Sequence, residues 1–238
     1  MTTAERLRSR LLAPALVALI SLCAALPARG AGERETIVFL HGMGRTRVSM
    51  AILAMRFQSA GYQTLSFPYS QKGSTLDEIS TAMSVFLAKK VRTAHYHLVG
   101  HSLGNIVIRS ALRRSLRPGL GRIVMLAPPN RPAQLARLLQ ENRLYRWLSG
   151  DSGQQIAQDG FYKTLPVPPV EFGVIAGDKG QKLTFAKPND GVLEVEATKL
   201  PGMKDFVIVH HTHTWLMNSK DTFDLCRRFL ESGAFRER

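Results

Sequence analysis

Cysteine is scarce in this chain, with only Cys23 and Cys226 among 238 residues. Cys23 falls in an apolar N-terminal stretch, so removal of that stretch leaves one thiol and excludes an internal disulfide in the processed chain. Charged residues make up only 21% of the sequence and no low-complexity linker is present, which excludes a disordered chain. We expect Cys226 to be a small core residue of a helix rather than a nucleophile.

Acidic residues are also few: 18 Asp and Glu stand against 32 Lys and Arg, giving a formal net charge of +14. Such a charge favours anionic surfaces. Arg109, Arg113, Arg114 and Arg117 recur along one predicted helix, where we expect a solvated face, and no nucleic-acid motif accompanies them. The charge therefore predicts no nucleic-acid partner and at most weak contact with an anionic membrane surface.

The N-terminal segment, 1–30, has the pattern of a secretory signal. Arg6, Arg8 and Arg10 precede an apolar run from Leu11 to Leu26, and Ala28-Arg29-Gly30 places small residues where a signal peptidase cleaves. The run is short for a bilayer-spanning helix, which needs about 20 residues. We expect 1–30 to be removed and 31–238 to be exported to the periplasm or the medium. The alternative is an uncleaved anchor in the inner membrane.

From Glu35 onward, short apolar runs alternate with amphipathic segments. A run such as Thr36 to Leu40 is typical of a strand buried on both faces of a parallel sheet. Thr75 to Glu78 forms a capping box before a predicted helix, and Gly61 and Gly233 are expected to end two others. The alternation predicts an α/β fold with a mostly parallel sheet and helices on both faces. We expect strands at 36–40, 62–67, 95–99, 122–126, 171–176 and 206–209, and helices at 47–60, 105–116 and 215–230 besides the capped one.

The segment 131–169 interrupts this alternation. A helical pattern over 131–149 is broken at Gly150 to Gly153, and three prolines crowd Leu165 to Pro169. We interpret 131–169 as a short lid-like excursion within a single domain, 31–238.

The most informative motif is Gly100-His101-Ser102-Leu103-Gly104, which fits the G-x-S-x-G pattern of a nucleophile elbow. A predicted strand precedes it and a predicted helix follows it, as the motif requires. The two glycines lack a Cβ, so the backbone can turn tightly and neighbouring elements can pack close to it. Ser102 is therefore the candidate nucleophile.

A serine hydroxyl needs a base to take its proton and an acid to orient that base. On an elbow fold the order along the chain is Ser, acid, His. Asp190, in the turn-forming cluster Pro188-Asn189-Asp190-Gly191, is the preferred acid, and Asp178 is its rival. Glu194 and Glu196 are weaker candidates because they alternate on what reads as a short strand.

The base is expected among three histidines that follow the last predicted strand. His213 begins the transition from loop to helix, where a side chain points over the sheet edge toward the elbow, and it is the preferred base. His211 is its competitor, and His210 still belongs to the strand by pattern.

An oxyanion hole needs two backbone N–H groups directed at the developing charge. Leu103, directly after the nucleophile, supplies one in our interpretation, and Met43, in the loop after the first strand, supplies the other. His41, Gly42 and Gly44 are expected to support that loop, and His101 to support the elbow.

With these segments placed, the chain resembles the α/β-hydrolase superfamily and, within it, the small bacterial lipases and esterases. A weaker similarity is to the deacylase domain that acts on glycolipid anchors. The resemblance implies a serine hydrolase that cleaves carboxylic esters of small molecules or lipids, with no metal and no organic cofactor. Its alternatives are an acyltransferase or thioesterase with the same triad, and a non-catalytic envelope-binding protein. The resemblance spans about 35–235 and is carried by His41-Gly42-Met43-Gly44, Gly100 to Gly104, Asn189-Asp190-Gly191-Val192 and His213-Thr214-Trp215-Leu216-Met217.

Overall fold

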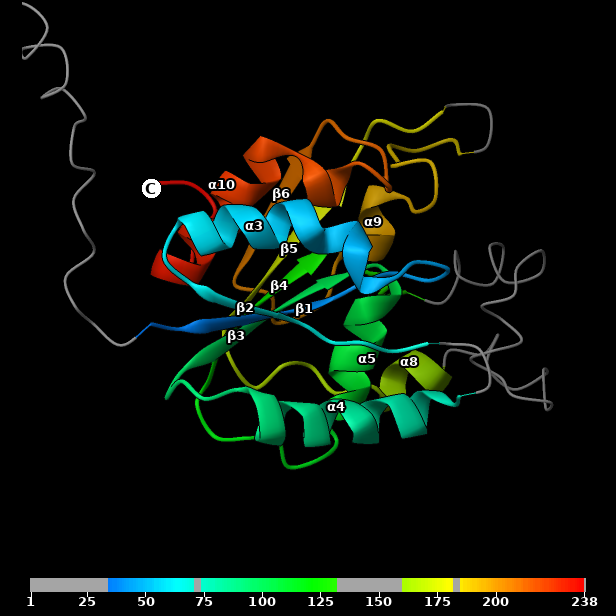
Figure 1. Cartoon of the computed structure of the whole chain (residues 1–238). Helices are drawn as coiled ribbons and strands as arrows, with labels where there is room; N and C mark the ends of the chain where they lie inside the picture. Colours follow the sequence, from blue (N-terminus) through cyan, green and yellow to red (C-terminus); the bar gives the residue numbers. More distant parts are fainter. Residues whose placement is uncertain (1–33, 71–73, 132–159, 182–184, 238) are drawn as a thin grey trace, which may run out of the picture. The chain divides into compact units, whose positions relative to one another are not determined.

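Six strands in the described part of the chain form one sheet, in which every neighbouring pair is parallel (Figure 1). The computed structural model describes residues 34–70, 74–131, 160–181 and 185–237. A strand lies at each expected place, so the predicted α/β class with a parallel sheet is confirmed. The strands are β1 (Thr36–Leu40), β2 (Gln63–Ser66), β3 (Tyr96–His101), β4 (Leu120–Leu126), β5 (Phe172–Gly177) and β6 (Asp205–Val209).

The strand order β2-β1-β3-β4-β5-β6 contains one reversal of direction. The chain passes from β1 to β2 at one edge, then returns to β3 on the other side of β1 and continues outward. In open α/β sheets, ligands bind beyond the carboxyl ends of the strands at such a switch point. His41 follows β1 and Ser102 follows β3, so two of the candidate segments lie there.

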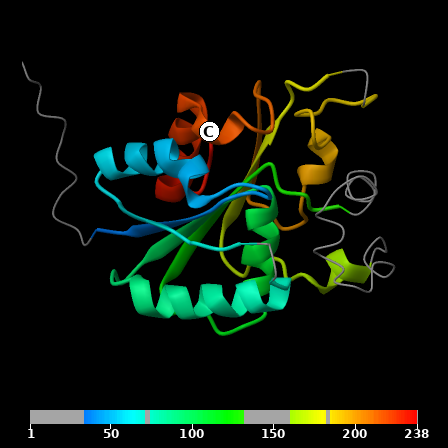
Figure 2. The same cartoon turned by 45° about the vertical axis from the view of Figure 1, so that its right-hand side comes forward.

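Helices cover both faces of the sheet, as predicted (Figures 1 and 2). Ile37 and Phe39 of β1 belong to the apolar cluster that includes α3 (Ala51–Ser59) and α10 (Lys220–Ser232), whereas Val38 and Leu40 belong to the cluster that includes α4 (Leu76–Lys90) and α5 (Leu103–Ala111). This alternation follows from the two-residue period of a strand. The helical segments are η1 (Arg47–Met50), α3 (Ala51–Ser59), α4 (Leu76–Lys90), α5 (Leu103–Ala111), α8 (Gly160–Thr164), α9 (Val195–Thr198), η3 (Leu216–Asn218) and α10 (Lys220–Ser232).

The predicted helix signals are present where the structure describes them. The Thr75 side chain accepts from the Glu78 N–H, and the Glu78 carboxylate accepts from the Thr75 N–H at 2.7 Å, which completes the capping box of α4. Gly61 and Gly233 follow α3 and α10 with φ of 93° and 79°, a conformation that glycine adopts without steric cost. Cys226 is fully buried in α10, as expected of a core residue, and burial raises the pKa of its thiol.

Several boundaries differ from the prediction. The helix after the elbow begins at Leu103 and ends at Ala111, so it starts before the expected range 105–116 and stops short of its end. The last helix begins at Lys220 rather than at Trp215, because Ser219 caps it by accepting from the Thr222 N–H. Glu194 and Glu196 do not alternate on a strand but flank the start of α9. The helix expected over 131–149 lies, from position 132 onward, outside the described residues.

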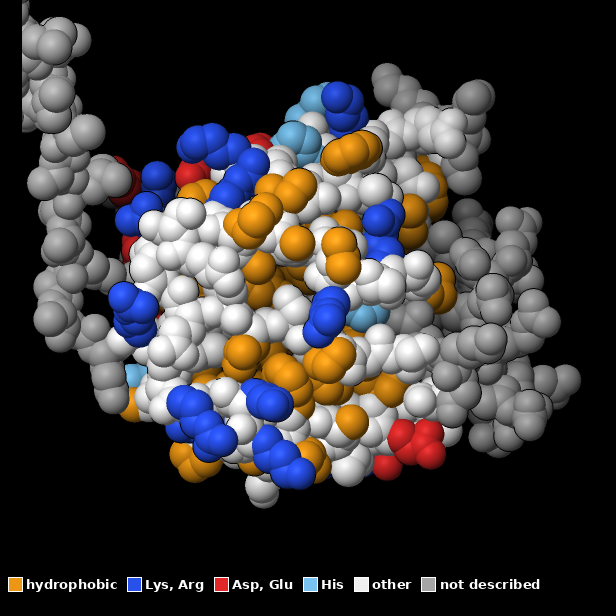
Figure 3. All heavy atoms as spheres, in the orientation of Figure 1, with side chains coloured by type: hydrophobic (Ala, Val, Ile, Leu, Met, Phe, Trp, Pro, Cys, Tyr) orange, Lys and Arg blue, Asp and Glu red, His pale blue; other side chains and the backbone are white. Residues whose placement is uncertain are grey.

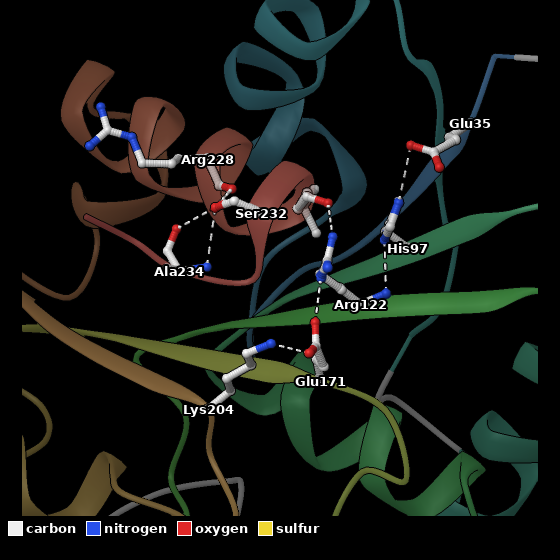
Figure 4. A network of polar contacts seen from close by, with 9 residues as sticks. Glu35, His97, Arg122, Glu171, Lys204, Arg228, Ser232 and Ala234 are labelled. Carbon is white, nitrogen blue, oxygen red and sulfur yellow. Dashed lines mark hydrogen bonds and ion pairs between the residues drawn. The ribbon is translucent and has the colours of Figure 1, made fainter. Parts of the chain in front are cut away.

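Polar side chains join the amino ends of the strands, at the edge of the sheet opposite Ser102 (Figure 4). His97 accepts from the Arg122 N–H with Nδ1 at 2.8 Å and donates from Nε2 to Glu35 at 3.4 Å. Glu171 accepts from Arg122 Nε at 2.8 Å and also pairs with Lys204. These contacts therefore fix the amino ends of the strands, which take no part in the candidate site.

Among the described residues, no helix is both long and apolar enough to cross a membrane.

Candidate active site

Ser102 occupies a strained backbone position between β3 and α5. Its φ of 51° and ψ of −121° are unfavourable for a residue with a Cβ, and such strain concentrates at functional sites. The Ser102 N–H donates to the Leu126 carbonyl at 2.9 Å, and the Asn105 side chain donates to the carbonyls of both residues at 3.1 Å. These bonds hold the elbow against the carboxyl end of β4.

The two elbow glycines are required by close packing. A Cβ at Gly100 would collide with the Asn105 side chain, and one at Gly104 would collide with the Leu40 carbonyl at the end of β1. The expectation that these glycines permit close approach is therefore confirmed. Their lack of a side chain lets α5 begin directly beside β1.

Asp190 and His213 form a buried pair. Oδ2 of Asp190 lies 2.7 Å from Nδ1 of His213, and only 2% of Asp190 and 9% of His213 are exposed. Oδ1 of Asp190 accepts from the N–H groups of Val192 and Leu193, at 2.9 and 2.7 Å. The His213 N–H also donates to the Asp190 carbonyl at 2.8 Å. Because Nδ1 faces a carboxylate, a neutral imidazole at this position carries its proton on Nδ1 and has its lone pair on Nε2.

The alternative candidates for the acid and the base make other contacts. Asp178 lies 2.9 Å from Nδ1 of His210, whose side chain is 74% exposed. His211 contacts Asp221 of α10 through Nε2 at 2.8 Å. The structure therefore brings neither Asp178 nor His211 into the buried Asp190–His213 pair.

His101 connects the elbow to the histidine loop. It is buried, and its Nε2 lies 2.9 Å from the His213 carbonyl, so Nε2 must be the protonated nitrogen. The rings of His101 and His213 lie 4.9 Å apart between centroids. Burial lowers the pKa of His101 well below its ordinary range, and the neighbouring His213 lowers it further. Neutral His101, directly before Ser102, thus anchors the backbone of His213.

The loop after β1 lies against the elbow. A Cβ added to Gly42 would lie 3.2 Å from the Ser102 Cβ and 3.0 Å from His101 Nδ1, so only glycine allows this approach without a shift. Met43 packs against the apolar cluster that contains Leu103. Neither the Met43 N–H nor the Leu103 N–H has a hydrogen-bond acceptor among the described residues.

His41 is held by a residue that sequence reasoning missed. Its ring stacks on Tyr69 with centroids 4.2 Å apart, and the Tyr69 hydroxyl donates to the His41 carbonyl. Burial lowers the pKa of His41, against the opposing effect of hydrogen bonds to the Gly42 and Tyr69 carbonyls. His41 is thus a support of the loop. No pattern in the sequence links it with Tyr69, which lies beyond the whole of α3 and β2.

The prediction that Arg109 lies on a solvated helix face is wrong. Only 2% of it is exposed, and its guanidinium donates to the Leu165 carbonyl at 2.7 Å, the Pro166 carbonyl at 3.0 Å and the Asn130 side chain at 3.1 Å. Burial lowers its pKa to about 10. This arginine therefore holds the segment after α8 against α5. The arrangement completes an apolar wall beside the elbow, formed by Leu103, Ile106, Tyr162 and Leu165 with Met43, Leu76 and Phe161 packed against it.

A cavity lined by several polar residues adjoins the buried pair. It has a volume of about 430 Å³ and is lined by Asp190 and His213 together with Lys179, Gln181 and Thr212, among others. In the described part of the chain, no three His, Cys, Asp or Glu side chains are grouped so that they could hold a metal ion.

Comparison with known proteins adds a structural likeness. No family model matches the sequence, and no curated protein with a matching sequence was found. An esterase from Exiguobacterium antarcticum is similar in structure, with a TM-score of 0.60 at 14% identity over 84% of this chain and 93% of that one. Esterase B from Lactobacillus rhamnosis, inhibited by a tributyrin phosphonate, has a TM-score of 0.60 at 14% identity over 86% and 77%.

An extracellular α/β-hydrolase from a Paenibacillus species gives a TM-score of 0.51 at 16% identity, over 85% of this chain and 99% of that one. Structural similarities at such low sequence identity support a shared fold but not a shared activity. Together with the all-parallel six-stranded sheet and its helices, they establish that this chain has the α/β-hydrolase fold.

Proposed function

We propose that the protein is a serine hydrolase that cleaves carboxylic esters, with Ser102 as nucleophile, His213 as base and Asp190 as the acid that orients it. The observation that carries this proposal is the buried hydrogen bond of 2.7 Å between Asp190 and His213, joined through His101 to a strained Ser102. Ser102 follows β3, Asp190 follows β5 and His213 follows β6, so all three candidate residues lie beyond the carboxyl ends of strands of one parallel sheet. That arrangement suits acyl transfer to a hydroxyl.

The proposed reaction proceeds in two steps. Nε2 of His213 takes the proton of Ser102 while Oγ attacks the acyl carbonyl, and the N–H groups of Met43 and Leu103 stabilise the oxyanion. His213 then gives the proton to the departing alcohol, which leaves an acyl ester on Ser102. In the second step His213 takes a proton from a water molecule as the water oxygen attacks the acyl carbonyl, and it gives that proton to Oγ of Ser102 as the bond between Oγ and the acyl carbon breaks and the carboxylic acid leaves.

The test is serine-dependent ester hydrolysis. The full chain, its Ser102→Ala variant and, as a control, the exposed Ser115→Ala variant are assayed on p-nitrophenyl esters. We expect Ser102→Ala to reduce kcat by several orders of magnitude and Ser115→Ala to have no effect. A serine-reactive phosphonate should label the wild type and not Ser102→Ala. Hydrolysis retained by Ser102→Ala would refute the proposal.

We further propose small, short-chain oxygen esters as substrates. The support is the apolar wall beside Ser102, which suits an acyl chain, and the likeness to an esterase inhibited by a tributyrin phosphonate. Butyrate esters should therefore be hydrolysed faster than palmitate esters. Faster turnover of matched thioesters, or acyl transfer to an added alcohol in preference to water, would instead indicate a thioesterase or an acyltransferase.

Export is part of the proposal. Cleavage before Ala31 leaves every described strand and helix intact, since β1 begins at Thr36. N-terminal sequencing of protein recovered from outside the inner membrane should start near Ala31. A start at Met1 or Thr2 would contradict cleavage and favour a retained anchor.

A further inference from the structure

Large apolar side chains are exposed on one flank of the fold. Val48, Ile52 and Met55 are 71%, 44% and 56% exposed, and their spacing along η1 and α3 places them on one side of these segments. Trp215, which is 66% exposed, follows the histidine loop. We name these four residues the α3 flank. Figure 3 shows apolar side chains gathered over α3 with Lys and Arg side chains around them.

Two hydrogen bonds fix Trp215 beside α3. Arg45 donates to the Thr214 hydroxyl at 2.9 Å, and Arg56 of α3 donates to the Asn218 carbonyl at 2.7 Å. These bonds lie on either side of Trp215 in the sequence. Trp215 therefore lies in a segment that is held beside α3, although β2 to β6 separate the two along the chain.

The α3 flank borders a groove in the protein surface. A groove of about 480 Å³ runs between α3 and α10 and is lined by Ile52, Met55 and Phe223, with Arg56 at its side. Isolated surface apolar residues need no explanation, but a contiguous apolar patch with a shallow groove marks an interaction surface.

Three arginine side chains around the flank, those of Arg45, Arg47 and Arg56, have no carboxylate partner among the described residues. The acidic side chains nearby on α10 are already paired: Asp221 with His211, Asp224 with Lys220 and Glu231 with Arg227. An apolar surface with an exposed tryptophan and guanidinium groups that lack a carboxylate is complementary to an anionic lipid bilayer. Such a bilayer accepts indole at its interface and arginine at its headgroups.

We propose that the α3 flank docks the protein on an anionic lipid bilayer, with Trp215 at the level of the headgroups. Trp215 follows closely on His213, so docking brings the candidate active site to the lipid surface. The docking goes beyond the proposed hydrolase function and does not depend on it. Only a benefit of docking for ester hydrolysis at the lipid surface rests on that function.

Trp215 itself supplies the test. The chain has two tryptophans, so Trp147→Phe leaves Trp215 as the only indole. The full chain carrying Trp147→Phe and Ser102→Ala is mixed with phosphatidylglycerol vesicles that contain brominated acyl chains. We expect a blue shift of the Trp215 emission and at least a twofold loss of its intensity, and much weaker changes with phosphatidylcholine. Because the signal arises at Trp215, it reports lipid contact at this residue, and an indole placed on another face reports any contact that an apolar N-terminal segment causes.

Matched variants locate the docking surface. Val85 of α4 is 45% exposed and lies with the helices of the opposite face, so Val85→Trp, with both native tryptophans replaced by Phe, should show no quenching. Met55→Asp and Arg47→Glu should each weaken vesicle binding about tenfold, whereas Val85→Asp should leave it unchanged. Ser102→Ala in all samples separates docking from hydrolysis.

Three outcomes would overturn the proposal. Trp215 unquenched on phosphatidylglycerol vesicles would exclude insertion of this flank. Equal quenching on phosphatidylcholine would exclude charge complementarity. A blue-shifted emission without vesicles would assign the flank to another occupant: a second copy of the chain if the shift grows with protein concentration, or a segment of the same chain if it does not.

Discussion

The imidazole of His101 donates from Nε2 to the backbone carbonyl of His213 at 2.9 Å. The residue before the candidate nucleophile is thereby bonded to the residue proposed as its base. Since His101 is buried and its pKa is lowered, its ring stays neutral and keeps this single-donor arrangement. The elbow and the histidine loop are therefore positioned as one unit.

Replacement of His101 tests this coupling. His101→Leu removes the donor, and we expect kcat for ester hydrolysis to fall about tenfold with KM nearly unchanged, because a buried hydrogen bond is worth about 1–1.5 kcal/mol. His101→Gln keeps an N–H at a similar reach and should recover most of the lost kcat. Equal losses in the two variants would show that the hydrogen bond is not what matters.

The two candidate acids give opposite predictions. Asp190→Asn retains the shape of the side chain but removes the charge that orients His213, so we expect kcat to fall by about 10³–10⁴. Asp178→Asn, whose carboxylate pairs with exposed His210, should change kcat less than twofold. Steady-state kinetics on a p-nitrophenyl ester measures both. A large loss in Asp178→Asn with normal activity in Asp190→Asn would reverse the assignment.

Most of the fold could be predicted from the sequence because its strands are short apolar runs. Thr36 to Leu40 is buried at every position, and such a run between turn residues has few alternatives to a central parallel strand. The order of the strands in the sheet could not be predicted in the same way. Which neighbour β1 takes on each side depends on crossovers through α3 and α4, and local patterns do not encode it.

The candidate site likewise combines features that the local sequence predicts with features that depend on tertiary contacts. The elbow carries its own local requirements, since Gly100 and Gly104 are needed for packing against Asn105 and Leu40. The sequence favoured Asp190 but left Asp178 open, because both sit in similar turns, and the buried contact of Asp190 with His213 is a tertiary feature that supports Asp190. Arg109 was wrongly expected on a solvated face, because the acceptors that bury it include main-chain carbonyls beyond β4, and main-chain carbonyls leave no sequence signal.

Arg109 should matter for stability more than its neighbour Arg113. Arg109→Met leaves buried carbonyls and the Asn130 side chain without a donor, so we expect the free energy of unfolding to fall by about 2–4 kcal/mol. Arg113 binds Thr164 at an exposed position, and Arg113→Met should cost about 1 kcal/mol or less. Urea denaturation of the two variants and the wild type measures the difference. Similar losses in both would contradict a special role for the buried guanidinium.

Stability should decrease as the pH falls below about 6.5. Burial lowers the pKa values of His41, His97 and His101, whereas the same side chains titrate near 6.5 in the unfolded chain. Between the folded and the unfolded pKa values the unfolded chain binds more protons, so acidification favours unfolding. Each group contributes a slope of up to about 1.4 kcal/mol per pH unit within that window, and none above it.

Denaturation midpoints measured from pH 7.5 down to pH 4.5 test this expectation. His101→Gln removes one of the three groups, so its free energy of unfolding should depend on pH less steeply below about pH 6.5 than that of the wild type. His95→Gln, at an exposed position, controls for loss of an imidazole as such. If both variants lose the same part of the slope, or the wild type has no slope in this range, burial of neutral His101 does not set the acid sensitivity.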